Sequence, residues 1–257
     1  MNVDKILIRN INKSGDDLKK TFDKLASGLR INKAADDPAG LAVAEKIKVA
    51  TVILSQGSKN IDYGTSAISI ADGALEQIGN IDQRQAELAT QAANGTYSDS
   101  QRASLNQEFQ ALSQERDRIA QSTEFNGQKL LTDSSVSIAT GSGDPISVDF
   151  SSIPSSGGSD ISTQAGARAA IDQIKSNINT STQSRADLGA SESRLESEKN
   201  AAETRILSLQ NAESRIRDAD IASVAAERVA ADIRQKSSTA LAAQNNQSKG
   251  RILDLLG

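Results

Sequence analysis

The chain has 257 residues and a formal net charge of −4, and it contains no Cys, His or Trp. The absence of Cys and His excludes thiolate nucleophiles, disulfides, histidine acid–base catalysis and zinc sites of the Cys/His type. The acidic balance argues against a general nucleic-acid-binding protein. We expect no cofactor and no nucleic-acid partner.

The composition favours a thin helical protein. Aromatic residues make up 2% of the chain, whereas a round core of this size normally contains bulky aromatic anchors. Long helices that pack along narrow seams need only Ala, Leu and Ile. We therefore expect a mainly α fold, an elongated antiparallel helical bundle or coiled coil with a small β-hairpin region.

No stretch of the sequence indicates a membrane-bound protein. The first residues lack an apolar run of signal-peptide length, and no later stretch is long enough to span a bilayer. We expect no membrane partner, and either a cytoplasmic protein or one exported by a route that uses no cleaved signal.

The first segment, residues 3–31, has the pattern of an amphipathic helix. Its apolar residues advance by seven, four, three and four, which is a heptad seam. These residues are Ile11, Leu18, Phe22, Leu25 and Leu29. A lone helix of this kind is marginal in water, so it needs a partner, and the other end of the chain is the candidate.

Residues 25–46, LASGLRINKAADDPAGLAVAEK, form the corner after this helix. Asp37 is a preferred N-cap for a new helix, and Pro38 suits the first helical position. A metal site at Asp36 and Asp37 is the alternative interpretation. It is less well supported, because no His, Cys or third carboxylate lies nearby in the sequence.

The next helical pattern runs from Pro38 to about residue 93 and ends at Asn94-Gly95. Its apolar residues recur every seven positions, and small residues three behind them predict close approach of a neighbouring helix. The apolar positions are Leu54, Ile61, Ile68 and Leu75, and the small ones include Gly57 and Gly64.

A third helix is predicted at about 99–125. It opens with a capping box at Ser98 and Gln101 and ends at Asn126-Gly127. Its run Glu115–Arg118 is expected to face solvent.

The remaining chain alternates between a polar segment and two helices. Residues 128–162 are rich in Ser, Gly and Thr, and short alternations at 136–138 and 146–150 predict one or two β-hairpins. Helical periodicity then returns over about 163–214 and again from 221. Asp218 and Asp220 are the candidate caps of the last helix.

The sequence resembles bacterial flagellin over essentially its whole length. The motifs that carry the resemblance are LASGLRINKAADDPAGLAVAEK at 25–46, QAELATQAANGT at 85–96, EFNGQKLL at 124–131 and SRIRDAD at 214–220. The resemblance implies a structural subunit that self-assembles into the extracellular flagellar filament used for swimming, and not an enzyme.

The resemblance also implies a domain organisation. Residues 1–45 and 221–257 would form an inner terminal coiled coil, and residues 46–220 an outer rod with the hairpin. The subunit interface would use the seam positions of the inner coiled coil. These are Leu18, Phe22, Leu25, Leu29, Val224, Ile233, Leu241, Leu255 and Leu256.

The partners that the resemblance implies are further copies of the chain, a C-terminal export chaperone gripping about 221–257, the flagellar export apparatus, and the filament cap and hook-junction proteins. Some flagellins are recognised by the vertebrate Toll-like receptor for flagellin. The matching positions here are Arg84, Leu88 and Glu108, expected to be exposed on the rod, whereas Ala86 stands where some recognised members have Arg.

A hook–filament junction protein, or another coiled-coil flagellar accessory protein, is the alternative function. Such a protein would share the helical ends and assemble only into short rings. An enzyme that uses paired carboxylates such as Asp218 and Asp220 is the third possibility, but no Gly-rich phosphate loop follows a strand.

Overall fold

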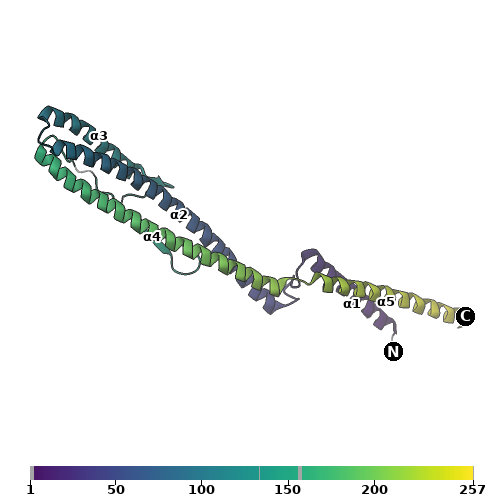
Figure 1. Cartoon of the computed structure of the whole chain (residues 1–257). Helices are drawn as coiled ribbons and strands as arrows, with labels where there is room; N and C mark the ends of the chain where they lie inside the picture. Colours follow the sequence, from purple (N-terminus) through teal and green to yellow (C-terminus); the bar gives the residue numbers. More distant parts are fainter. Residues whose placement is uncertain (1–2, 133, 156–157, 257) are drawn as a thin grey trace. The chain divides into compact units, whose positions relative to one another are not determined.

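The computed structural model describes residues 3–132, 134–155 and 158–256, with only the helical backbone described for 3–4 and 252–256. Within these ranges the protein is mainly helical, as the sequence predicts (Figure 1). The helices are α1 (Val3–Ser27), α2 (Pro38–Ala93), α3 (Asp99–Ser122), α4 (Gln164–Arg217) and α5 (Ile221–Leu256). The described part of the chain includes no helix with the length and apolarity needed to cross a membrane.

The chain divides into two compact units. The central unit spans Val52–Ile206, and the terminal unit combines the residues up to Thr51 with those from Leu207 onward. Helices α2 and α4 contribute to both units, whereas α1 and α5 belong to the terminal one. The division into an inner coiled coil of 1–45 plus 221–257 and an outer rod of 46–220 remains a prediction.

The core of the central unit confirms the predicted heptad seams. On α2, Leu54, Ile61, Ile68 and Leu75 are all at most 3% exposed. Apolar positions of α4 at the same seven-residue spacing, such as Leu188 and Leu195, are buried against them. Helix α3 lies beside α2, and its Phe109 is buried with Leu88 in a second cluster (Figure 1).

The polar segment forms a hairpin, as its alternation predicts. Strands β3 (Ser134–Ile138) and β4 (Ile146–Phe150) pair antiparallel with Val136 opposite Val148. Every second residue of β4 is buried and packs against α2 and α4, which is the two-residue period of a half-buried strand.

Helix α3 ends at Ser122, before the predicted stop at Asn126-Gly127. Asn126 and Gly127 both have positive φ, 51° and 78°, and they form the two-residue turn between β1 (Glu124–Phe125) and β2 (Gln128–Lys129). An Asn-Gly pair suits such a hairpin turn as well as a helix end. The capping box at the other end of α3 is confirmed, since the Gln101 N–H donates to Ser98 Oγ and the Ser98 N–H donates to Gln101 Oε1.

The small residues on α2 allow close approach of the hairpin as well as of helix α4, since a Cβ at Gly64 would lie 3.5 Å from Cδ1 of Leu195. A Cβ at Gly57 would collide with the carbonyl oxygen of Thr140, and one at Gly64 with the Cδ1 of Ile138. The β3 strand and the turn after it therefore lie against the α2 backbone.

The run Glu115–Arg118 does not wholly face solvent. Arg116 is fully buried, and its Nε donates to Asp82 Oδ1 over 2.8 Å while its Nη1 donates to the Pro154 carbonyl over 2.5 Å. Burial raises the pKa of the Asp82 carboxyl above its usual range, and the nearby Arg116 guanidinium opposes that rise. This ion pair joins α2 and α3 to the segment that follows β4.

Candidate assembly surface

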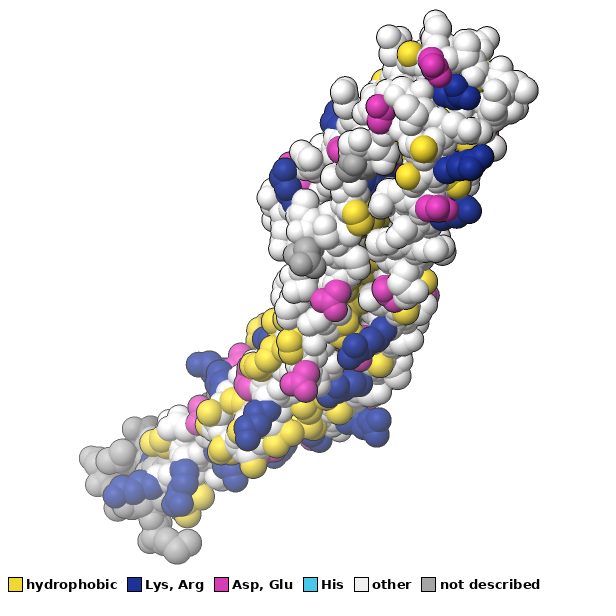
Figure 2. Space-filling model, turned by 90° about the vertical axis from the view of Figure 1, so that its left-hand side faces the viewer, with side chains coloured by type: hydrophobic (Ala, Val, Ile, Leu, Met, Phe, Trp, Pro, Cys, Tyr) yellow, Lys and Arg dark blue, Asp and Glu magenta, His cyan; other side chains and the backbone are white. Residues whose placement is uncertain are grey.

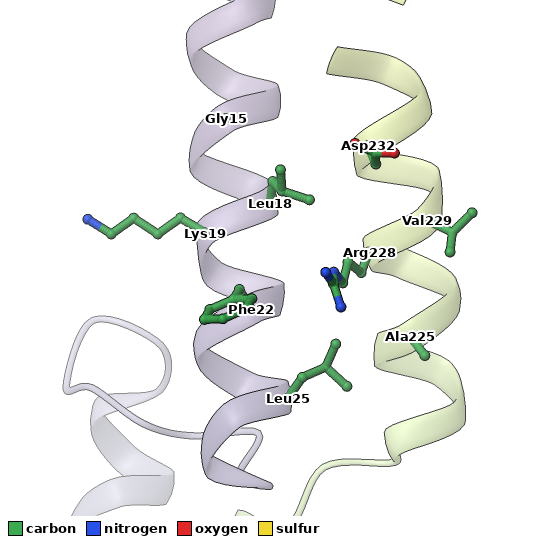
Figure 3. A pocket seen from close by; sticks show the side chains of 9 residues that line it. All are labelled: Gly15, Leu18, Lys19, Phe22, Leu25, Ala225, Arg228, Val229 and Asp232. Carbon is green, nitrogen blue, oxygen red and sulfur yellow. The ribbon is translucent and has the colours of Figure 1, made fainter. Parts of the chain in front are cut away.

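Helices α1 and α5 pair antiparallel in the terminal unit and leave a groove between them, here called the terminal groove (Figure 3). The groove has a volume of about 590 Å³. Leu18 and Leu25 point from α1 toward α5, whereas Arg228 points from α5 toward α1. The Arg228 guanidinium lies 5.8 Å from the centre of the Phe22 ring, within the range of a cation–π interaction.

Large apolar side chains remain exposed on both helices. Phe22, Ile233 and Leu241 are 57–59% exposed. Leu18 and Leu25 are half-buried, and Val224 is buried. Figure 2 shows hydrophobic side chains gathered among Lys and Arg side chains toward the lower end of the face that it presents. The side chains of Leu255 and Leu256 lie outside the described residues.

The segment that joins α1 to α2 and the segment that joins α4 to α5 are hydrogen-bonded to each other. The Arg30 N–H donates to the Arg217 carbonyl over 2.6 Å, and the Ala219 N–H donates to the Gly28 carbonyl over 2.9 Å. Residues 28–30 and 217–219, here called the terminal clamp, therefore form a short antiparallel bridge centred on Leu29 and Asp218. The terminal clamp thus brings together two of the motifs that carry the family resemblance, those at 25–46 and 214–220.

The terminal clamp corrects the prediction for Leu29. Helix α1 ends at Ser27, because Gly28 takes a left-handed conformation (φ 71°) and its N–H donates to the Lys24 carbonyl. Leu29 is thus outside the helix and half-buried at the bridge. It is not a seam position of the α1–α5 pair.

Asp36 and Asp37 both accept hydrogen bonds from backbone N–H groups of nearby residues. Asp37 accepts the N–H groups of Ala39 and Gly40 and caps α2, as predicted. Asp36 accepts those of Asn32 and Lys33, and these bonds lower the pKa of its carboxyl. No group of three or more His, Cys, Asp or Glu residues that could hold a metal ion occurs among the described residues.

The final helix begins at one of the two predicted caps. Asp220 Oδ1 accepts the N–H groups of Ala222 and Ser223 and so caps α5. Asp218 is instead hydrogen-bonded to Ser214 Oγ.

The three positions matched to receptor recognition differ in exposure. Arg84 and Glu108 are exposed and joined by two hydrogen bonds of 3.0 and 2.8 Å, and Arg84 also pairs with Glu87 at 2.8 Å. The expectation that Leu88 is exposed is wrong. It is 1% exposed, because it packs with Phe109 in the core between α2 and α3.

Comparison with known proteins decides the family. Residues 2–136 match the family described as bacterial flagellin N-terminal helical region, and residues 171–256 match the bacterial flagellin C-terminal helical region. The chain belongs to the bacterial flagellin family. It is therefore a structural subunit of the extracellular flagellar filament and not an enzyme.

Relatives of similar length support this assignment to flagellin. A flagellin of Halalkalibacterium halodurans is 39% identical over 248 residues, covering 93% of this chain and 91% of that protein. The flagellar filament 30.7 kDa core protein of Treponema maltophilum is 34% identical, covering 95% of this chain and 93% of that protein. These names describe filament proteins, and they do not favour the accessory-protein alternative.

Solved structures agree with the helical fold of flagellin. The crystal structure of Bacillus cereus flagellin has a TM-score of 0.51 and 30% identity, covering 56% of this chain and 88% of that one. A putative flagellar hook-associated protein from Vibrio parahaemolyticus has a TM-score of 0.62 over 71% of this chain and all of that one. Its identity is 12%, so this second likeness concerns the fold alone.

Sequence reasoning did not identify Arg30, Arg217 or Arg228 as important residues of this flagellin. The one usable signal was that Arg228 lies four residues after Val224, and therefore on the same side of the helix. The contacts of Arg30 with residues about 185 positions away leave no local pattern.

Proposed function

We propose that the terminal groove, together with the exposed apolar residues of α1 and α5, is the surface through which copies of this chain assemble into the filament. The observation that carries the proposal is the 57–59% exposure of Phe22, Ile233 and Leu241. Two paired helices have too little mutual contact to cover such side chains, so a neighbouring copy supplies the cover. Leu18, Leu25 and Val224 hold the pair together from inside.

A charge placed at Ile233 tests this proposal. Because Ile233 is exposed in the single chain, Ile233→Asp is expected to leave the monomer folded and to prevent polymerisation at concentrations where the parent forms filaments. The matched control is Thr239→Asp, which adds the same charge to an exposed residue of α5 about 240° around the helix. Electron microscopy and sedimentation give the result, and normal filaments from Ile233→Asp would refute the proposal.

We further propose the partners that accompany flagellin assembly. An export chaperone would bind about 221–257, the flagellar export apparatus would carry the chain out, and the filament cap and hook-junction proteins would be its neighbours. Family membership supports these partners. Capture of the same chaperone by a chain lacking 221–257 would overturn the first of them.

We also propose that the vertebrate Toll-like receptor for flagellin contacts the monomer at Arg84 and Glu108. Both are exposed, whereas buried Leu88 supports the surface from beneath. The variant Arg84→Ala is expected to weaken the response of receptor-bearing reporter cells, and Arg118→Ala, an exposed arginine further along α3, is the control. An unchanged response to Arg84→Ala would remove this contact.

A further inference from the structure

The buried apolar residues of the central unit form two separate groups. The larger group, here called the main cluster, is made by α2, the end of α3, α4 and the hairpins, and it extends to Ile78, Ile119 and Leu188 on the three helices. The smaller group, here called the Ala-rich cluster, is made by the other parts of the same helices and includes Leu88, Phe109 and Ile174. The two clusters have no buried residue in common among the described residues.

Buried polar residues lie between the two clusters on all three helices. They are here called the polar layer, and they are Asp82 and Gln85 on α2, Ser113 and Arg116 on α3, and Asn177, Ser181 and Ser184 on α4. Each of them is at most 8% exposed. The buried positions of each helix therefore change from apolar to polar and back to apolar, and the polar layer extends across the whole core.

Hydrogen bonds within the polar layer join α2 to α3. Gln85 Nε2 donates to Ser113 Oγ over 2.7 Å, and Arg116 Nε donates to Asp82 Oδ1 over 2.8 Å. Asp82 Oδ2 is buried and accepts no hydrogen bond from the described residues. Because a buried oxygen without a partner costs free energy, this layer stabilises the core less than an apolar layer of the same size would.

The α4 side of the polar layer contains a buried hydroxyl group without a hydrogen bond. Ser184 Oγ donates to the Thr180 carbonyl of its own helix over 2.9 Å, whereas Ser181 Oγ has no partner within the described part of the chain. A hollow of about 290 Å³ lies beside Gly79 and is lined by residues of α2 and α4, including Ser181. Solvent therefore comes next to the layer at this point.

The Ala-rich cluster also buries smaller side chains than the main cluster. Four of its eight buried residues are Ala, whereas four of the eighteen in the main cluster are Ala. The stabilisation gained by burial grows with the apolar area removed from water. The contacts that hold the Ala-rich cluster closed are therefore expected to be weaker than those of the main cluster.

We propose that the polar layer interrupts the cooperativity of the central unit: the helix segments around the Ala-rich cluster open together while the main cluster stays folded. These segments are 86–93 of α2, 99–112 of α3 and 164–176 of α4. Their opening breaks one small cluster and the polar layer, whereas global unfolding breaks both clusters, so the local opening needs less free energy. This inference concerns the central unit and does not depend on the proposed assembly surface.

Native-state hydrogen exchange of the full chain, below the concentration at which filaments form, tests the separation. We expect amides of the Ala-rich segments to exchange about tenfold or more faster than those of the main cluster, after correction for intrinsic rates. The variant Ile68→Val shortens a buried side chain of the main cluster. Because one buried methylene group changes an equilibrium about fourfold, exchange in the main cluster should accelerate about fourfold, and exchange in the Ala-rich segments should stay unchanged.

The matched control is Ile174→Val, which removes the same group from the Ala-rich cluster. It is expected to accelerate exchange in both regions, because local opening and global unfolding both break the contacts of Ile174. If Ile68→Val instead accelerates exchange in both regions equally, the central unit unfolds as one cooperative body and the inference is overturned.

A second pair of variants tests the polar layer as the boundary. Ser181 and Ser184 are both 4% exposed, but only Ser184 has a hydrogen bond to lose. An unsatisfied buried hydroxyl typically costs enough to change an equilibrium about fivefold or more. Exchange in the Ala-rich segments should therefore be about fivefold slower in Ser181→Ala than in Ser184→Ala. Equal rates would overturn the role of the layer, and circular dichroism checks that all four variants keep the fold.

Discussion

The same heptad pattern of apolar residues is buried in the central unit of this flagellin and partly exposed in its terminal unit. In the central unit, Leu54, Ile61 and Leu75 are at most 3% exposed, because three helices and a hairpin cover them. In the terminal unit, Phe22, Ile233 and Leu241 stay 57–59% exposed on a pair of helices. A heptad pattern of apolar residues therefore predicts that these residues will be buried. The number of neighbouring helices and strands decides whether they are buried within one chain or by a second copy.

Removing α5 is expected to have the largest effect, which is the loss of filament assembly. A chain lacking 221–257 loses half of the terminal pair and is expected to form no filaments at any accessible concentration. The central unit should keep its helicity and its melting transition, because its core is made by α2, α3, α4 and the hairpin. Electron microscopy and circular dichroism measure the two properties, and loss of the central transition would show that the units do not fold independently.

Breaking the buried ion pair should most strongly destabilise the central unit. Arg116→Ala leaves the Asp82 carboxylate buried without its partner, and such a change typically costs about 3–5 kcal/mol. Arg118→Ala is the matched control, because its pair with Glu115 is exposed and worth about 1 kcal/mol or less. Urea unfolding measures both, and equal losses would contradict the burial of Arg116.

Two of the glycines of α2, which lie in different surroundings, are expected to give smaller effects of opposite sign on stability. Gly57→Ala places a methyl group against the Thr140 backbone and should destabilise the central unit by about 1–3 kcal/mol. Gly73→Ala meets nothing within 4 Å and should stabilise the helix by roughly 0.5–1 kcal/mol. Thermal melting of both variants tests the close approach of the hairpin.

The smallest expected effect is a local pH dependence in the terminal unit. Hydrogen bonds from the Lys33 and Asn32 N–H groups lower the pKa of the Asp36 carboxyl below its usual 3.8. The stability that Asp36 gives to this turn is therefore fully present above about pH 3.8 and is lost as the pH falls through the lower folded pKa. Amide exchange at residues 32 and 33 should accelerate in that range, and Asp36→Asn should remove the dependence.

Periodicity was sufficient to predict the helices and the buried seams of the central unit. Leu188 and Leu195 on α4, like Ile61 and Ile68 on α2, are buried as their seven-residue spacing predicts. Local turn chemistry was less decisive. Asn126-Gly127 satisfies the requirements of a helix stop and of a hairpin turn alike, and the pairing of Glu124 with Lys129 and of Phe125 with Gln128 shows that it forms a hairpin turn.

Long-range contacts of charged residues could not be predicted from the sequence. Arg116 lies in a run of four charged residues, and nothing local marks it as the one that meets Asp82 inside the core. The same is true of Arg30 and the α4 carbonyls. The prediction that Leu88 is exposed was wrong for a different reason. It came from the family resemblance and not from the position of Leu88 in the helical spacing.

The bridge between residues 28–30 and 217–219 is made by main-chain groups. The identities of the side chains at its centre, Leu29 and Asp218, are therefore not required for the two peptide segments to recognise each other. Substitutions at Leu29 and Asp218 should be tolerated as long as Gly28 keeps its left-handed conformation. Both positions are therefore suitable for attaching a dye to a growing filament.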